Sequence, residues 1–103
     1  MTTSYRQPIL KVQYRSSLGI MHDILHACMD GGLEGVLISE ISRKANLSHL
    51  AALQNLQRLV HAGLARSIRT ERNSIFVITE KGIKFYREFQ KFQAIAQELK
   101  IRY

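Results

Sequence analysis

The sequence is poor in cysteine, in acidic residues and in long apolar runs, and each shortage excludes a class of protein. Its single cysteine, Cys28, rules out an internal disulfide and a four-cysteine zinc site. No apolar run approaches the roughly 18 residues of a membrane-spanning helix, and the N-terminus lacks the apolar segment of a signal peptide. We therefore expect a cytoplasmic protein in a reducing compartment, with no membrane partner and with Cys28 buried as a small hydrophobe.

The shortage of acidic residues leaves a large positive charge. Eight Asp and Glu stand against 15 Lys and Arg, which gives a formal net charge of +7. Hydrophobic residues make up 46% of the 103 residues, enough for the core of one domain, so the chain is not a disordered tail. Such a charge favours polyanionic partners, nucleic acid before an anionic membrane surface. The alternative is a charge that only keeps an ordinary protein soluble.

The spacing of apolar residues predicts three helices in the first two thirds of the chain. One of the serines at 16–17 caps the first helix, and the glycine pair 31–32 ends it. A short second helix covers 37–45. Ser48 is a good N-cap for a third helix, which Gly63 terminates. At 3.6-residue spacing the third helix places one apolar face in the core: Ala52, Leu53, Leu56, Leu59 and Val60.

The remaining chain predicts two strands and a long helix. Segments 64–70 and 74–79 are rich in β-branched residues and flank a charged tripeptide, which indicates a hairpin. Thr79 then caps a last helix that runs toward the C-terminus. The predicted fold class is mainly α with a small β-hairpin (α+β). Its expected parts are a basic N-terminal arm or short strand (1–16), a central domain (17–79) and a C-terminal helix (80–103).

Two short helices joined by a tight turn and followed by a hairpin are the pattern of a winged helix-turn-helix. In that fold the second helix of the turn enters the major groove of DNA, where phosphates would repel a carboxylate. The sequence has no acidic residue between Glu40 and Glu71, a stretch that includes the whole third helix. We therefore predict that the central domain binds duplex DNA. A helix that lacks acids and simply packs against a neighbour is the alternative.

The expected DNA surface is the face of the third helix that points away from the core. Ala51 leaves room for close approach, and Gln54 and Asn55 can pair with adenine edges. Arg58 can reach guanine or a phosphate, and the N-terminal end of the helix offers donors to a phosphate. The other expected contacts are Ser48 and His49 at that end, Arg43 and Lys44 on the second helix, and Arg66, Arg69 and Arg72 on or beside the hairpin, where Glu71 is the one unfavourable charge.

Three segments resemble a family of small archaeal winged-helix DNA-binding proteins: MHDILHACMDGG, ISRKANLSHLAALQNLQRLVHAGL and FVITEKGIKFYREF. The resemblance covers about residues 14–103 and is most specific in the turn 45–48, the helix stop 62–64 and the entry to the last helix at 78–82. It implies a transcription regulator or a chromatin-type protein, located at the nucleoid. It also implies a homodimer held by an antiparallel coiled coil of the C-terminal helices.

The last helix carries a heptad seam of its own, because apolar residues recur at alternating steps of four and three. In an antiparallel pair centred on Ala94, Phe92 faces the partner's Ala96, so that a large side chain meets a small one. A parallel pair would stack alanine on alanine and leave a thin layer. A helix folded onto its own domain is the alternative. The expected dimer contacts are Phe85, Phe89, Phe92, Ile95, Ala96, Leu99 and Tyr103.

No catalytic or metal site is expected, and no cofactor. His22 and His26 with Asp23 superficially resemble the HExxH zinc signature, but aspartate is shorter than glutamate and no third ligand follows. We expect both histidines on the wetter face of the first helix. No nucleophile elbow or P-loop is present either. The rival functions are a winged-helix adaptor that binds another protein, and RNA binding, which the scarcity of exposed aromatic residues disfavours.

Overall fold

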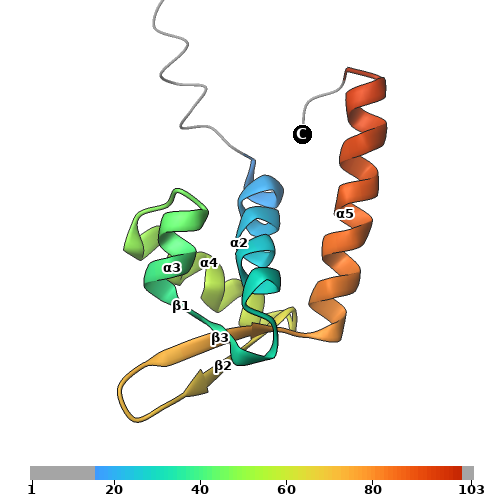
Figure 1. Ribbon diagram of the computed structural model, residues 1–103. Helices are drawn as coiled ribbons and strands as arrows, with labels where there is room; N and C mark the ends of the chain where they lie inside the picture. The colour runs from blue at the N-terminus through green and yellow to red at the C-terminus, as the bar shows by residue number, and fades with distance from the viewer. Residues whose placement is uncertain (1–15, 101–103) are drawn as a thin grey trace, which may run out of the picture.

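The computed structural model describes residues 16–100 and shows a mainly helical protein with a small antiparallel sheet, as the sequence predicts (Figure 1). In Figure 1, α2 stands between the α3–α4 pair and α5, and the sheet lies beneath these helices. Apart from Ser16, the expected N-terminal arm lies outside the described residues. In chain order the elements are α2 (Ser17–Gly31), the 3-10 turn η1 (Gly32–Glu34), β1 (Val36–Leu37), α3 (Ile38–Lys44), α4 (His49–His61), β2 (Ala65–Arg69), β3 (Ser74–Ile78) and α5 (Glu80–Glu98).

The predicted helix ends are confirmed by their hydrogen bonds. The side-chain oxygens of Ser16, Ser48 and Thr79 each accept a bond from the backbone N–H three residues on, at 3.0, 3.1 and 3.0 Å. Each bond satisfies an N–H group that has no partner within its own helix. At the other ends, Gly32 and Gly63 have φ of 56° and 80°, the left-handed region that glycine enters without strain. Serine and threonine therefore fix where α2, α4 and α5 begin, and glycine fixes where α2 and α4 stop.

Between residues 16 and 100 the sequence pattern predicts two strands, and the structure has three. The short strand β1 pairs with β3 through Val36 opposite Phe76 and Leu37 opposite Ile75, which gives the strand order β1-β3-β2. A strand of two residues is too short to show an alternating pattern, so nothing in the sequence pattern signals it. Its pairing ties the segment that precedes α3 to the hairpin of β2 and β3 (residues 65–78), which we call the wing.

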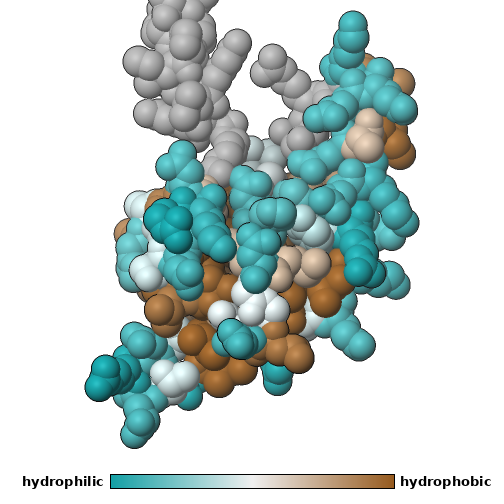
Figure 2. All heavy atoms as spheres, in the orientation of Figure 1, coloured by the Kyte–Doolittle hydropathy of each residue, from teal (hydrophilic) through white to brown (hydrophobic). Residues whose placement is uncertain are grey.

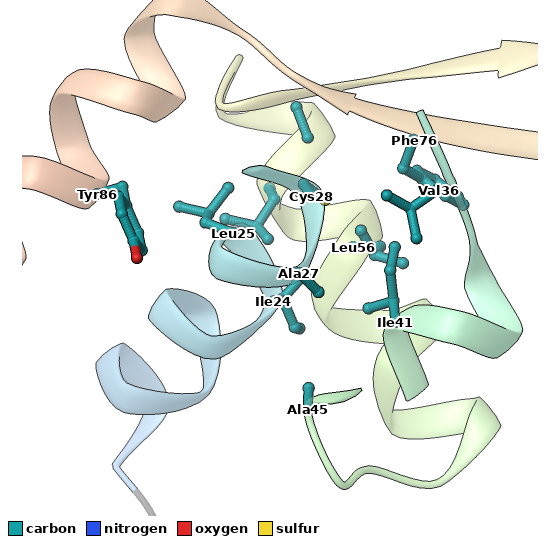
Figure 3. Packing of buried hydrophobic residues seen from close by; sticks show 12 residues of the cluster. Ile24, Leu25, Ala27, Cys28, Val36, Ile41, Ala45, Leu56, Phe76 and Tyr86 are labelled. Carbon is teal, nitrogen blue, oxygen red and sulfur yellow. The ribbon is translucent and has the colours of Figure 1, made fainter. Parts of the chain in front are cut away.

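The hydrophobic core lies where α2, α3, α4 and the sheet meet (Figure 3). Removing a leucine or isoleucine side chain from water contributes about 1.5–3 kcal/mol, so this cluster holds α4 against the rest of the domain. Burial also raises the pKa of the Cys28 thiol to about 11, in agreement with its expected role as a small hydrophobe. The largest fully buried side chains are Ile24, Leu25 and Cys28 of α2, Ile41 of α3, and Leu56 and Leu59 of α4.

His22 corrects the expectation that both histidines of α2 lie on its wetter face. Its side chain is only 12% exposed, and its ring stacks on Tyr86 of α5 with centroids 4.7 Å apart and contacts Phe89 at 5.2 Å. Burial lowers the pKa of His22, against the opposing effect of Asp23 beside it. The exposed His26 meets the Tyr86 hydroxyl through Nδ1 at 2.5 Å. The sequence cannot show that α5 covers this face of α2, which is why the prediction failed for His22.

The start of α5 is joined directly to the end of α4. The Thr79 hydroxyl, which caps α5, donates to the Gly63 carbonyl at 2.7 Å. The Lys81 ammonium group donates to the Ala62 carbonyl at 2.8 Å. Both acceptors belong to the end of α4, where carbonyl groups lack helical partners. Gly82 is buried at the same junction.

The last helix is shorter than the sequence predicts. α5 ends at Glu98 with Leu99 as its C-cap, and Lys100 has a φ of 59° that does not continue a helix. Its 19 residues span about 28 Å at 1.5 Å per residue. Tyr103, the last residue of the expected seam, lies outside the described residues. Between residues 16 and 100 no helix is long and apolar enough to cross a membrane.

Candidate nucleic-acid interface

The turn between α3 and α4 is held by its own hydrogen bonds. Asn46 has a φ of 55°, a left-handed conformation that asparagine tolerates better than most residues. Next to it, the Leu47 N–H donates to the Ser42 carbonyl at 2.9 Å, and the Ser42 hydroxyl donates back to the Leu47 carbonyl at 2.5 Å. The turn thus sets the angle at which α4 leaves α3, and with it the face that α4 turns to solvent.

α4 presents an exposed strip on the side opposite its buried residues. Members of this strip follow one another at steps of four, four and three, so they form one line along the helix. The strip contains no acidic group, and Leu50 at its N-terminal end is 62% exposed. Ala51 is half-buried beside it. The outward strip of α4 consists of Leu50, Gln54, Arg58 and His61.

The two amides that the sequence assigns to base contacts differ in position. Gln54 lies on the outward strip and is exposed, whereas Asn55 is half-buried on the flank of α4. The Asn55 side-chain amide donates to the Ala51 carbonyl one turn earlier, at 2.8 Å. A contact from Asn55 to a base requires that this bond be given up. Gln54 is therefore the amide available to an external partner without rearrangement.

The basic residues of α3 are exposed near the turn but are not equivalent. Arg43 and Lys44 form the last turn of α3, just before α4 begins. The Lys44 ammonium lies 3.6 Å from the Asp30 carboxylate of α2. This exposed pair contributes little to stability, yet it directs part of the Lys44 charge inward. Arg43 forms no ion pair among residues 16–100, so its charge is available to a ligand.

The three arginines expected on the wing do not share one face. Successive residues of a strand point to opposite sides of the sheet. Ser67 and Arg69 line the side that faces α4, together with Arg72 of the wing tip. Arg66 therefore projects from the other side of the same strand. The structure brings Arg69 and Arg72 together with α4 and leaves Arg66 apart from them.

A cleft of about 750 Å³ separates α4 from the wing. His49 and His61 border it from the two ends of α4, and Gln57 lies between them. The cleft could not be predicted from the sequence, because its walls come from segments that are distant along the chain. One local signal exists, since Leu53, Gln57 and Val60 recur at helical spacing beside the outward strip. Further polar residues of its lining are Ser39, Ser67, Asn73 and Ser74.

The expected seam of α5 divides into a buried and an exposed part. Phe89 and Ala96 are buried, and Phe85 is half-buried. Phe92, Ile95 and Leu99 are 48%, 55% and 64% exposed. Figure 2 shows hydrophobic atoms along the upper part of α5, and hydrophilic atoms over the tip of the wing at the lower left. The apolar surface that α5 offers to a partner is therefore narrower than the full heptad seam.

Comparisons with known proteins identify the fold. A winged helix-turn-helix family matches residues 14–97. Among solved structures, Sso10a-2, a DNA-binding protein from Sulfolobus solfataricus, has a TM-score of 0.74 and 28% identity, and the alignment covers 82% of this chain and 85% of that one. The PcaV transcriptional regulator from Streptomyces coelicolor has a TM-score of 0.72 at 18% identity, with 78% and 60% covered.

A third similar structure is a point mutant of MepR from Staphylococcus aureus, bound to an oligodeoxyribonucleotide. Its TM-score is 0.63 at 18% identity, with 90% of this chain and 68% of that chain covered. No curated protein matches the sequence. At 18% identity, PcaV and MepR support the fold alone. Because the family match spans most of the sequence and the helices and strands follow the predicted order, the chain belongs to the winged helix-turn-helix family.

Proposed function

We propose that the protein binds duplex DNA and catalyses no reaction, acting as a transcription regulator or a chromatin-type protein. The observation that carries the proposal is the outward strip of α4, which has no acid in it or anywhere between Glu40 and Glu71. The likeness to Sso10a-2, which is described as a DNA-binding protein, supports it at 28% identity. A solvated helix with no polyanionic partner has no reason to avoid glutamate over this length.

In the proposed complex α4 enters the major groove, which is wide enough to admit a helix. Gln54 faces base edges, Arg58 reaches a phosphate toward the far end of the helix, and Leu50 and Ala51 make apolar contacts in the groove. The flanking charges lie where phosphates would pass: Arg43 before α4, the Ser48–His49 end of the helix, and Arg69 and Arg72 on the wing. Lys44, held by Asp30, and Arg66, on the other side of the wing, contribute less than these.

We also propose that two copies assemble through α5 into an antiparallel homodimer. The support is the exposed apolar stripe of Phe92, Ile95 and Leu99 near the C-terminal end of the helix. In the antiparallel pair centred on Ala94 that the heptad seam predicts, Ile95 lies near its own copy. On this proposal residues 17–79 bind DNA, and residues 80–103 set the distance between two recognition helices.

A salt titration tests DNA binding. Four guanidinium groups per protomer are proposed phosphate contacts, which gives eight in the dimer: Arg43, Arg58, Arg69 and Arg72 of each copy. The logarithm of the binding constant falls with the logarithm of the salt concentration by roughly 0.9 per phosphate contact, so the affinity should drop about 10⁴-fold between about 50 and 200 mM salt. The protein is titrated into a labelled random-sequence duplex at both concentrations. We expect tight binding at low salt and a steep loss at high salt. No binding at low salt would refute the proposal and favour the adaptor interpretation.

A matched pair of variants locates the surface. Arg58→Gln removes one charge from the outward strip, and Arg87→Gln removes one from an exposed position of α5. We expect Arg58→Gln to weaken binding and to reduce the salt slope by about one per protomer. Arg87→Gln should leave both unchanged. Equal effects of the two variants would show that only net charge matters, and that α4 does not enter the groove.

A further inference from the structure

The cleft between α4 and the wing has the dimensions of a small-molecule site. Its volume of about 750 Å³ falls within the roughly 300–1,000 Å³ of typical ligand pockets. Five elements line it, namely β1, α3, α4, β2 and β3, together with the wing tip. Contact with DNA along the outward strip of α4 needs no such hollow, because of the four residues of that strip only His61 lines the cleft.

The floor of this cleft is apolar. Leu53 and Val60 contribute from α4, Ile38 from α3 and Phe76 from β3. Phe76 belongs to the buried core cluster, and Ile38 and Val60 pack against that cluster. A sugar-phosphate backbone carries little apolar surface and gains little from such a floor. A ring or a short hydrocarbon chain removes apolar area from water here, at about 25 cal/mol per Å².

The rim of the cleft is basic and contains no acid. Arg69 and Arg72 come from the wing, and His49 and His61 from the two ends of α4. Neither arginine forms an ion pair among the residues that the structure describes. A guanidinium group binds a carboxylate through two parallel hydrogen bonds, a geometry that few other side chains reproduce. An apolar floor below unpaired arginines matches a ligand with an apolar body and a single negative group.

We propose that this cleft binds a small organic anion, with its apolar ring or chain on the Leu53–Val60–Phe76 floor and its carboxylate on Arg69 and Arg72. The same two arginines are proposed phosphate contacts, so a bound anion and DNA exclude each other. The competition rests on the proposed function, whereas the ligand site does not. Such a site makes the protein an effector-responsive DNA binder, released from DNA by an amphipathic carboxylate.

The direct test uses the full chain without DNA and 2-naphthoate as the probe, followed by titration calorimetry. The neutral 2-naphthamide has the same shape without the charge. Arg69→Gln removes the proposed anchor, and Arg66→Gln removes an equal charge from the other side of the same strand. We expect one naphthoate per protomer, and binding at least about tenfold weaker for the amide and for Arg69→Gln. Arg66→Gln should bind as the wild type does.

A second variant tests the floor without changing charge. Ser67→Phe places a ring in the cleft from an exposed position of β2, and it should abolish naphthoate binding while the far-ultraviolet dichroism stays native. The site is refuted if naphthoate shows no saturable binding to the wild type, or if Arg69→Gln and Arg66→Gln bind it equally.

A third measurement separates the site from the proposed function. Naphthoate added to the protein–DNA complex should raise the apparent Kd for DNA in the wild type and leave it unchanged in Ser67→Phe. Naphthoate binding that depends on Arg69, in a protein that binds no DNA at low salt, would support the site and refute the proposed function. Salt-dependent DNA binding with no response to naphthoate would refute the site and leave the proposed function standing.

Discussion

Replacing Gly82 by alanine should have two opposite effects on stability, a gain in helix propensity and a steric clash at the junction of α4 and α5. Gly82 is the third residue of α5, and its N–H donates to the Thr79 hydroxyl. Its backbone is compatible with alanine, and in an exposed helix the exchange would add about 1 kcal/mol of stability. A Cβ atom here, however, would lie 2.0 Å from the Leu64 carbonyl oxygen and 2.7 Å from Cγ1 of Ile78.

The packing effect exceeds the gain in propensity. The first obstacle is a backbone atom that cannot rotate away, so α5 or the start of β2 must move by more than about 1 Å to reach ordinary contact distance. The Leu64 carbonyl also accepts the Thr79 N–H at 3.1 Å, and a shift weakens that bond. Overpacking costs about 1–3 kcal/mol and occasionally more, and a weakened hydrogen bond costs about 1 kcal/mol. After the gain is subtracted, we expect about 1–3 kcal/mol of net destabilisation, or roughly 5–20 °C in Tm.

Gly19 provides a matched control. It is the third residue of α2, and its N–H donates to the Ser16 cap in the same way. Within the part of the chain that the structure describes, a Cβ atom at Gly19 meets only the Ser16 side-chain oxygen, at 3.1 Å. Thermal and urea unfolding of both variants at one protein concentration gives the comparison. We expect Gly19→Ala to stay within about 1 kcal/mol of the wild type. The reasoning is refuted if Gly82→Ala is as stable as Gly19→Ala.

Three single side chains carry the remaining predictions. Ile95→Glu should turn the proposed dimer into a monomer in sedimentation, because a carboxylate would be buried against its own copy. Gln97→Glu, at an exposed position, should leave the protein a dimer. If both variants remain dimers, the proposed dimer contact at Ile95 is wrong. The free energy of unfolding should fall as the pH drops below about 6.5, because the lowered pKa of His22 in the folded protein means that the unfolded chain binds a proton more readily than the folded one. Urea titrations across this pH range should show a smaller fall for His22→Phe. An identical pH dependence of the two proteins would contradict this. Cys28, whose thiol pKa is about 11, should resist iodoacetamide at about pH 8 in the folded protein and react after unfolding, as mass spectrometry will show; rapid native labelling would mean that the core opens.

Local features of the fold were predictable because they depend on a few neighbouring residues. Ser16, Ser48 and Thr79 cap their helices through bonds that span three residues, and Gly63 stops α4 by its own φ. Contacts between distant segments were not predictable in this way. β1 exists only because β3 lies beside it, and His22 is partly buried because Tyr86 of α5 stacks on its ring.

The candidate site likewise combines features that local sequence predicts with features that depend on contacts between distant segments. The outward strip of α4 follows from helical periodicity and from the absence of acids, both visible in the sequence. The separation of Arg66 from Arg69 follows from strand alternation once the strand's bounds are known. The Asn55 bond to Ala51 and the cleft beside Gln57 depend on side-chain packing and on the approach of the wing to α4, which a single sequence does not encode locally.

The bonds of Thr79 and Lys81 to the carbonyl groups at the end of α4 couple the orientation of α5 to that of α4. In the proposed dimer, the direction of each recognition helix is then dictated by the direction of α5. One residue inserted into α5 before the dimer contact would rotate the DNA-binding domain by about 100° about the axis of α5, relative to the dimer contact, and move it by about 1.5 Å along that axis. The alignment of the two recognition helices with successive turns of DNA therefore depends on the junction of Thr79 and Lys81 with α4, which contacts neither DNA nor the other copy in the proposed complex.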